Sequence, residues 1–121
     1  MKQKVYQEKP EILYKEMIKM TKRQNLNAKD IIKDIEKYNS ELKRLDVKKI
    51  GLFGSYIKGK QHKSSDLDFI VKFKNPTFDK YMGLKFLLEK IFHKKSDLVI
   101  EDNLKPGLEH VKKEAVYAKG F

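Results

Sequence analysis

Two aspartates spaced two apart, Asp66 and Asp68, are the residues of this sequence best suited to chemistry, and they stand at the start of a predicted strand. Because successive side chains of a strand face opposite ways, the two carboxylates share one face and repel each other. Burying such a pair without a cation is costly, and hard oxygen ligands favour Mg²⁺ or Mn²⁺. The pair is therefore a candidate divalent metal site, although two aspartates at this spacing are also common by chance.

A third carboxylate, Asp97, opens the next predicted strand. If that strand neighbours the one that carries Asp66 and Asp68, the Asp97 side chain joins the same cluster. Three carboxylates that converge at strand ends suit the paired-metal sites of phosphoryl and nucleotidyl transfer. Taken alone, Asp97 is equally consistent with an acid on the surface, so this prediction depends on how the strands pair.

A glycine–serine pair, Gly54 and Ser55, directly follows another predicted strand and is expected to open a short helix. Backbone N–H groups at the start of a helix, together with a hydroxyl, form an anion site, and glycine lets a phosphate approach the backbone. Lys58 and Lys60 follow closely and add positive charge. A phosphate site and metal-binding carboxylates on adjacent strands are what a metal-bound nucleoside triphosphate requires.

The same region nearly spells a P-loop, because Gly54 is followed after four residues by Gly59 and Lys60. The next residue is Gln61, where that motif needs a serine or threonine for Mg²⁺. A P-loop also needs a long helix after its lysine, whereas here the chain soon enters the strand that carries Asp66. We therefore reject the P-loop interpretation.

Hydrophobic periodicity places these residues on a small sheet flanked by helices. Asn27 is typical of a helix N-cap, and the apolar residues after it recur at helical spacing. The predicted elements are helices over about 29–44, 81–92 and 108–115 and strands over 47–53, 67–73 and 98–100. Three strands interleaved with helices predict an α+β or α/β domain built on a small mixed sheet.

Residues 1–26 precede this domain as a predicted helical extension, and residues 27–121 form the domain itself. Within 13–18 the apolar residues recur at helical spacing, with charged residues between them. This apolar face either packs on the domain, forms a homodimer contact or docks a partner, since amphipathic helices commonly lie in grooves. We favour packing on the domain or a homo-oligomer contact.

The composition excludes several classes of protein. The 121 residues include no cysteine, which excludes disulfides, thiolate zinc sites and cysteine nucleophiles. No apolar run approaches the roughly 20 residues of a membrane span, and no signal peptide follows the basic N-terminus, so we expect a cytoplasmic protein without a membrane partner. The net charge of +11 favours an anionic partner. Because Arg23 and Arg44 are the only arginines, nucleic-acid binding is possible but not favoured.

The glycine–serine pair, ten intervening residues and then Asp66-Leu67-Asp68 resemble the signature of the DNA polymerase beta-like nucleotidyltransferases. The surrounding sequence resembles the minimal nucleotidyltransferase (MNT) branch of that superfamily in particular. The stretches that carry this likeness are 51–56 (GLFGSY), 65–71 (SDLDFIV), 96–99 (SDLV) and 104–106 (LKP). The resemblance covers about residues 28–118.

This resemblance implies the DNA polymerase beta-like fold and an antitoxin paired with a HEPN-domain ribonuclease toxin, which it silences by transferring AMP from ATP to a tyrosine. Asp66 and Asp68 would bridge two Mg²⁺ ions. Asp97 would bind the metal nearer the attacking hydroxyl and help to deprotonate it. Gly54 and Ser55 would hold the β- and γ-phosphates of ATP.

Two other functions are weighed against this one. The domain is alternatively a binding module that neutralises its partner by contact, although the presence of all three aspartates argues against a decayed site. Transfer of a nucleotide to RNA or to a small molecule is the other alternative, but such relatives usually carry a further substrate-binding domain. Lys58 stands where the family often has arginine, which keeps the charge but loses the bidentate fork, so no catalytic role is assigned to it.

Overall fold

The computed structural model describes residues 26–62 and 64–121, so the predicted extension over 1–26 lies outside the described residues apart from Leu26. The elements that follow in chain order are α3 (Ala28–Lys37), α4 (Asn39–Arg44), β1 (Val47–Phe53), α5 (Ser55–Lys58), β2 (Leu67–Phe73), α6 (Phe78–Phe92), β3 (Ser96–Ile100), the 3₁₀ helix η2 (Glu101–Asn103), α7 (His110–Glu114) and β4 (Val116–Tyr117).

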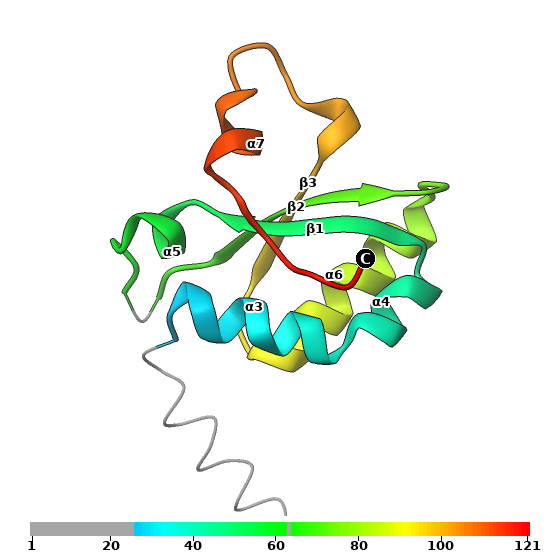
Figure 1. The fold of residues 1–121 in the computed structure, drawn as a ribbon, viewed down its shortest axis with the longest axis horizontal. Coiled ribbons are helices and arrows are strands. Elements are labelled where there is room, and N and C mark those ends of the chain that lie inside the picture. The colour runs from blue at the N-terminus through cyan, green and yellow to red at the C-terminus, as the bar shows by residue number, and fades with distance from the viewer. Residues whose placement is uncertain (1–25, 63) are drawn as a thin grey trace, which may run out of the picture.

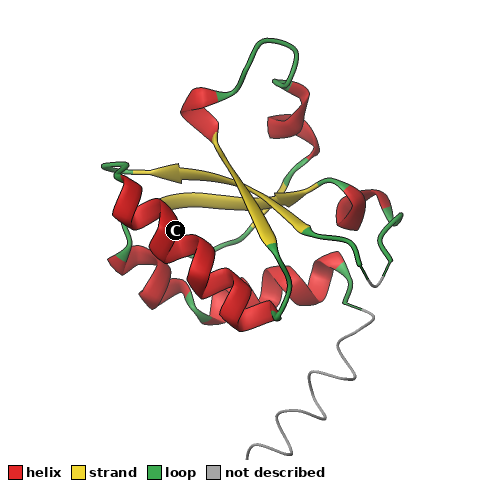
Figure 2. Ribbon diagram, turned by 180° about the vertical axis from the view of Figure 1, so that it is seen from behind, coloured by secondary structure: helices red, strands yellow, loops and turns green. Residues whose placement is uncertain are grey.

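The strands form one four-stranded mixed sheet in the order β3-β2-β1-β4. Strand β1 pairs antiparallel with β2 and β4, whereas β2 pairs parallel with β3. A parallel pair needs a crossover connection, and helix α6 supplies it between β2 and β3. Helices α3, α4 and α6 lie on one side of the sheet, and α7 lies on the other (Figures 1 and 2). The predicted α+β class with a small mixed sheet is confirmed.

The hydrophobic core lies between the sheet and the layer of α3, α4 and α6. Every second residue of β2 is buried from Leu67 to Phe73, as expected for the face that packs on helices. Phe69 stacks on Phe92 of α6, with ring centroids 6.2 Å apart. The fully buried side chains from the helices include Ile31, Ile35, Leu42, Leu84 and Leu88.

The structure corrects the predicted helices in three places. The helix predicted over about 29–44 is two helices, because Tyr38 leaves the helical conformation between α3 and α4. Helix α6 begins at Phe78 rather than at 81, since the Thr77 hydroxyl accepts a hydrogen bond from the Lys80 backbone N–H and caps it. The last helix spans only His110–Glu114.

The strands also differ from the prediction of three. Strand β3 begins at Ser96 instead of 98, because the buried Ser96 backbone N–H is satisfied by the Glu89 carboxylate, which a hydrophobic pattern cannot reveal. The fourth strand, β4, was missed because two residues are too few to show an alternating pattern.

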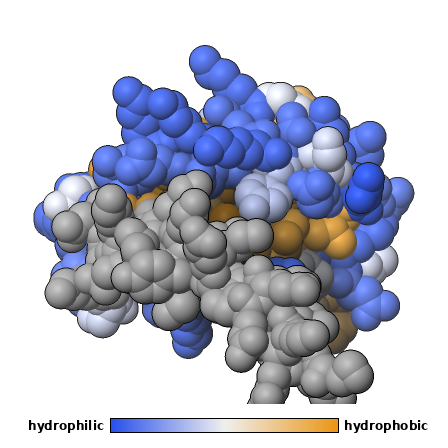
Figure 3. Space-filling model, turned by 90° about the horizontal axis from the view of Figure 1, so that it is seen from below, coloured by the Kyte–Doolittle hydropathy of each residue, from blue (hydrophilic) through white to orange (hydrophobic). Residues whose placement is uncertain are grey.

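Charged side chains dominate the exterior. Seen from below the helical layer, the described surface is mostly hydrophilic, with a band of hydrophobic residues between the hydrophilic ones (Figure 3). Phe78 and Phe86 of α6 are among the exposed apolar side chains. Within residues 26–62 and 64–121, no helix has both the length and the apolar character needed to cross a membrane.

Strand β4 is held on β1 by a close contact between Tyr117 and Gly51. The two residues are register partners, and a Cβ placed on Gly51 would lie 2.9 Å from the Tyr117 ring. The Lys49 ammonium lies 4.7 Å from the centroid of the same ring, within the range of a cation–π contact. Gly51 therefore leaves the space that the Tyr117 ring occupies.

We predict that Gly51→Ala lowers the free energy of unfolding by about 1–3 kcal/mol, because the added methyl group overpacks the Tyr117 ring. In a Tyr117→Ala background the same substitution should cost less, since the ring is gone. Urea unfolding of the two single variants and the double variant measures this coupling. Strictly additive effects would contradict the contact.

Candidate active site

Strands β2 and β3 bring Asp68 and Asp97 side by side. The two residues are register partners in the parallel pair, and their neighbours Leu67 and Ser96 are also paired and are buried toward the helices. Because side chains alternate along each strand, Asp68 and Asp97 point to the opposite face, away from α6. The strand pairing on which the sequence prediction depended is therefore present.

Asp66 lies immediately before β2, and its charge acts on Asp68. Burial raises the pKa of Asp68, and the negative charges of Asp97 and Asp66 raise it further, in that order. Asp97 and Asp66 are thus both close enough for their charges to act on Asp68. Asp68 is half-buried between the strands, whereas Asp97 is exposed to solvent.

Gly54 lies against the Asp68 carboxylate at the end of β1. Phe53, the residue before it, is the register partner of Asp68, and a Cβ on Gly54 would overlap the Asp68 carboxylate oxygen. Gly54 also has φ +82° and ψ −148°, a conformation that side chains rarely adopt. Two independent constraints, space and backbone conformation, therefore require glycine at this position.

Helix α5 begins directly after this glycine, as predicted. The Gly54 carbonyl accepts hydrogen bonds from the backbone N–H groups of Ile57 and Lys58, each at 3.1 Å. Ser55 opens the helix, at the end of the molecule where β1 ends and the loop to β2 begins (Figure 1). The glycine–serine turn and the aspartates consequently lie on neighbouring strands of the sheet.

The side chains around the turn divide into buried and exposed ones. Tyr56 is only 4% exposed and packs in the hydrophobic core. Lys58 and Lys60 are exposed and leave positive charge beside the turn. A cavity of about 240 Å³ lies elsewhere, beyond the far end of β2, and is lined by Phe73, Pro76, Thr77, Phe78, Tyr81, Ile100 and Asn103.

The donor set fits a divalent cation chemically, although its side chains are not gathered around one point. Carboxylate oxygens are the ligands that Mg²⁺ and Mn²⁺ prefer, and a cation would relieve the repulsion that raises the pKa of Asp68. Among the described residues, no three or more acidic, histidine or cysteine side chains are grouped closely enough to hold a metal.

Helix α6 contributes polar residues that the sequence analysis did not single out. Lys85 and Glu89 form an ion pair of 3.1 Å, and both contact the backbone of Ser96, next to Asp97. Their spacing of four residues is a recognisable helical signal, but their contact with β3 depends on how the helix packs.

The sequence matches a known protein family. The family model described as "Nucleotidyltransferase domain" matches residues 32–119. The chain belongs to this family. The matched residues include the glycine–serine pair and all three aspartates. The protein is therefore a nucleotidyltransferase, and its sheet and helices have the DNA polymerase beta-like fold.

Similar proteins agree with this assignment. The protein adenylyltransferase MntA of Thermococcus cleftensis is 35% identical over 95 residues, which cover 76% of this chain and 96% of that protein. A solved structure assigned to the minimal nucleotidyltransferases is 30% identical, with a TM-score of 0.65, and covers 75% of this chain and 95% of its own. A toxin–antitoxin crystal structure with AMP-PNP is 26% identical, with a TM-score of 0.57, and covers 71% of this chain and 73% of its own.

We predict that Gly54→Ala abolishes most nucleotidyl transfer and lowers the free energy of unfolding by about 1–3 kcal/mol, because the methyl group meets the Asp68 carboxylate in a strained backbone. Gly59→Ala is the matched control. Gly59 also has a positive φ of +69°, but a Cβ there meets nothing within 4 Å. Its loss of stability should be about 1–2 kcal/mol, with activity retained. Equal losses of activity would contradict a special role for Gly54.

We further predict that Asp68→Asn raises the melting temperature of the metal-free protein at neutral pH, because it removes a carboxylate whose charged form is disfavoured by burial and by the neighbouring acids. The sign follows from the raised pKa of Asp68: ionised Asp68 costs stability above that pKa, and the cost disappears as the pH falls below the ordinary aspartate value. Thermal unfolding from neutral to acidic pH should therefore show the two proteins converging. A variant that is less stable at neutral pH would contradict the repulsion.

Proposed function

We propose that the protein is a Mg²⁺-dependent adenylyltransferase of the cytoplasm that transfers AMP from ATP to a tyrosine of a partner toxin, a HEPN-domain ribonuclease, and so neutralises it. The observation that carries the proposal is the pairing of Asp68 with Asp97 on adjacent parallel strands, with Gly54 packed against the Asp68 carboxylate. In this proposal residues 27–121 are the catalytic domain and the preceding residues are an extension.

The relatives support the substrate and the partner. The Thermococcus cleftensis relative is named a protein adenylyltransferase, which specifies both the group transferred and a protein acceptor. The toxin–antitoxin structure contains AMP-PNP, an analogue of ATP. A net charge of +11 favours the approach of a polyanionic nucleotide to this chain.

Each site residue then has a distinct task. Asp66 and Asp68 would hold Mg²⁺, and Asp97 would be a further ligand on the side of the acceptor. Gly54 and Ser55 would hold the β- and γ-phosphates through backbone N–H groups of the turn and the Ser55 hydroxyl. When bound, the metal ions neutralise the charge that develops on the phosphate oxygens.

The transfer is an in-line displacement at the α-phosphorus. The tyrosine oxygen forms a bond to this phosphorus while the bond to the β-phosphate oxygen breaks, and pyrophosphate leaves with that oxygen. The tyrosine proton passes to Asp97, which is the carboxylate of the three that is exposed to solvent. Positioning by these residues and electrostatic stabilisation by the Mg²⁺ ions that they would hold account for most of the rate in this proposal.

The test is transfer of label from α-labelled ATP to the co-purified partner toxin in the presence of Mg²⁺. The wild-type protein should label the toxin and abolish its ribonuclease activity. The Asp66→Asn/Asp68→Asn double variant should lose at least about 100-fold in labelling rate, because electrostatic stabilisation of the transition state is removed. Asp79→Asn, at the start of α6 and away from the site, is the matched control and should label normally.

The same experiment separates the alternative functions. If the double variant still neutralises the toxin and no label appears on it with the wild-type protein, neutralisation occurs by contact alone. If label appears on RNA or on a small molecule instead of the toxin, the proposed acceptor is wrong. Mass spectrometry of the labelled toxin should find AMP on a tyrosine.

A further inference from the structure

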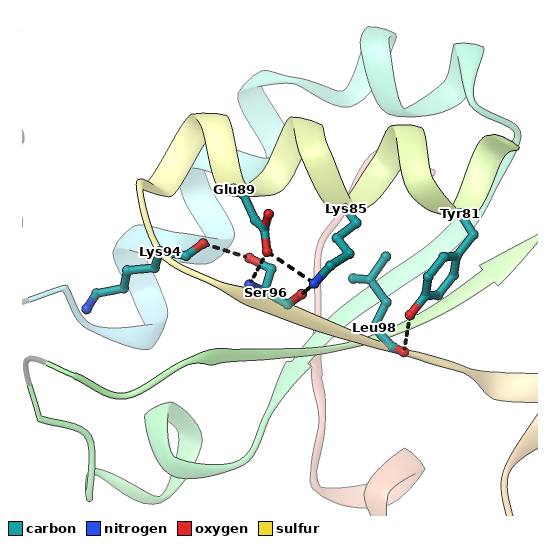
Figure 4. A network of polar contacts seen from close by, with 6 residues as sticks. All are labelled: Tyr81, Lys85, Glu89, Lys94, Ser96 and Leu98. Carbon is teal, nitrogen blue, oxygen red and sulfur yellow. Dashed lines mark hydrogen bonds and ion pairs between the residues drawn. The ribbon is translucent and has the colours of Figure 1, made fainter. Parts of the chain in front are cut away.

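Three side chains of helix α6 reach the outer edge of β3 and occupy its backbone groups. The Glu89 carboxylate accepts a hydrogen bond from the Ser96 backbone N–H at 3.0 Å, and Lys85 donates to the Ser96 carbonyl at 2.5 Å. The Tyr81 hydroxyl donates to the Leu98 carbonyl at 3.3 Å. Figure 4 shows these groups in a row along the helix, facing the strand.

These contacts lie on the side of β3 that has no neighbouring strand. The Lys95 carbonyl bonds to the Leu67 backbone N–H toward β2, so the backbone groups of Ser96 and Leu98, which alternate with it, point outward. In the described sheet β3 is an edge, where such groups normally stay unpaired. Side chains of helix α6 therefore form the hydrogen bonds with the outward backbone groups of β3 that a further strand would otherwise form with its backbone.

The contacts are made to the backbone of the residues on either side of Asp97. The Ser96 carbonyl belongs to the peptide that enters Asp97, and the Leu98 carbonyl belongs to the second peptide beyond it. Lys85 and Glu89 are joined to each other at 3.1 Å, so the two groups that hold Ser96 form one unit. The bond from Ser96 and the charge of Lys85 lower the pKa of Glu89, which keeps this acceptor ionised.

We infer that the Lys85–Glu89 pair is a positioning device for Asp97, fixing the strand backbone so that the Asp97 carboxylate is presented beside Asp68. The inference rests on the proposed role of Asp97 as a metal ligand. Asp97 is exposed, so its side chain receives little guidance from packing and depends on the backbone that carries it. Outer partners of this kind commonly orient the ligands of metal sites.

The experiment measures binding of Mn²⁺ alone to the full chain by electron paramagnetic resonance, with no nucleotide or toxin present. Glu89→Ala removes the acceptor for Ser96, whereas Glu89→Gln keeps an acceptor of the same shape. Lys85→Met removes the second contact with little change in length. Lys90→Met, on an exposed position of the same helix, is the control. Circular dichroism establishes that each variant is folded.

Glu89→Ala and Lys85→Met should raise the dissociation constant for Mn²⁺ roughly tenfold, as expected for a lost outer partner, with Glu89→Gln restoring much of the affinity. The Mg²⁺ concentration that gives half-maximal transfer should shift in parallel, and Lys90→Met should change neither value. If Glu89→Ala does not fold, the dissociation constant of the Lys85→Met variant for Mn²⁺ tests the inference.

Two results would overturn the inference in distinguishable ways. If Asp97→Asn weakens Mn²⁺ binding while folded Glu89→Ala and Lys85→Met bind it normally, the pair only protects the sheet edge and the proposed function stands. If Asp97→Asn itself binds Mn²⁺ normally, Asp97 is no ligand, and both its proposed role and the positioning device fail.

Discussion

The half-buried carboxylate of Asp68 is the constraint around which this end of the molecule is built. It lies beside its register partner Asp97 and directly against Gly54, where no side chain fits. Burial and the charges of Asp97 and Asp66 raise its pKa, so this position disfavours the charged carboxylate. A protein tolerates such a cost where function requires the group, and the strands on either side fix that group in place.

The parallel pairing of β2 and β3 makes this arrangement possible, and helix α6 makes the pairing possible. A parallel pair needs a crossover, and this one packs Leu84 and Leu88 into the core on one side of the helix. Another side of the same helix presents Lys85 and Glu89 to the free edge of β3. One element thus builds the core, sets the strand direction and closes the edge.

Much of this was predictable from local patterns, and the rest depended on packing. The Asp66–Asp68 pair and the glycine–serine turn lie beside strands with clear apolar patterns, so their placement followed from the sequence. Asp97 required knowledge of which strands are neighbours, which short-range periodicity does not contain. Strand β4 has two residues, and the start of β3 is marked by a buried serine whose partner is seven residues away. Local hydrophobicity carries no signal for either.

Another buried acid of the chain, Glu101, differs from the site aspartates in its ion pairs. Glu101 is also buried on the sheet, but Lys49 and Lys112 lie 3.5 and 3.7 Å from its carboxylate and neutralise it. The chain has 28 basic residues against 17 acidic ones, so lysines are abundant. Yet within residues 26–62 and 64–121 no lysine forms an ion pair with Asp68 or Asp97. Glu101, a buried acid with a structural role, is thus paired with lysines. Asp68 and Asp97 have no such partner among the described residues, so a cation from solution is their natural counter-charge.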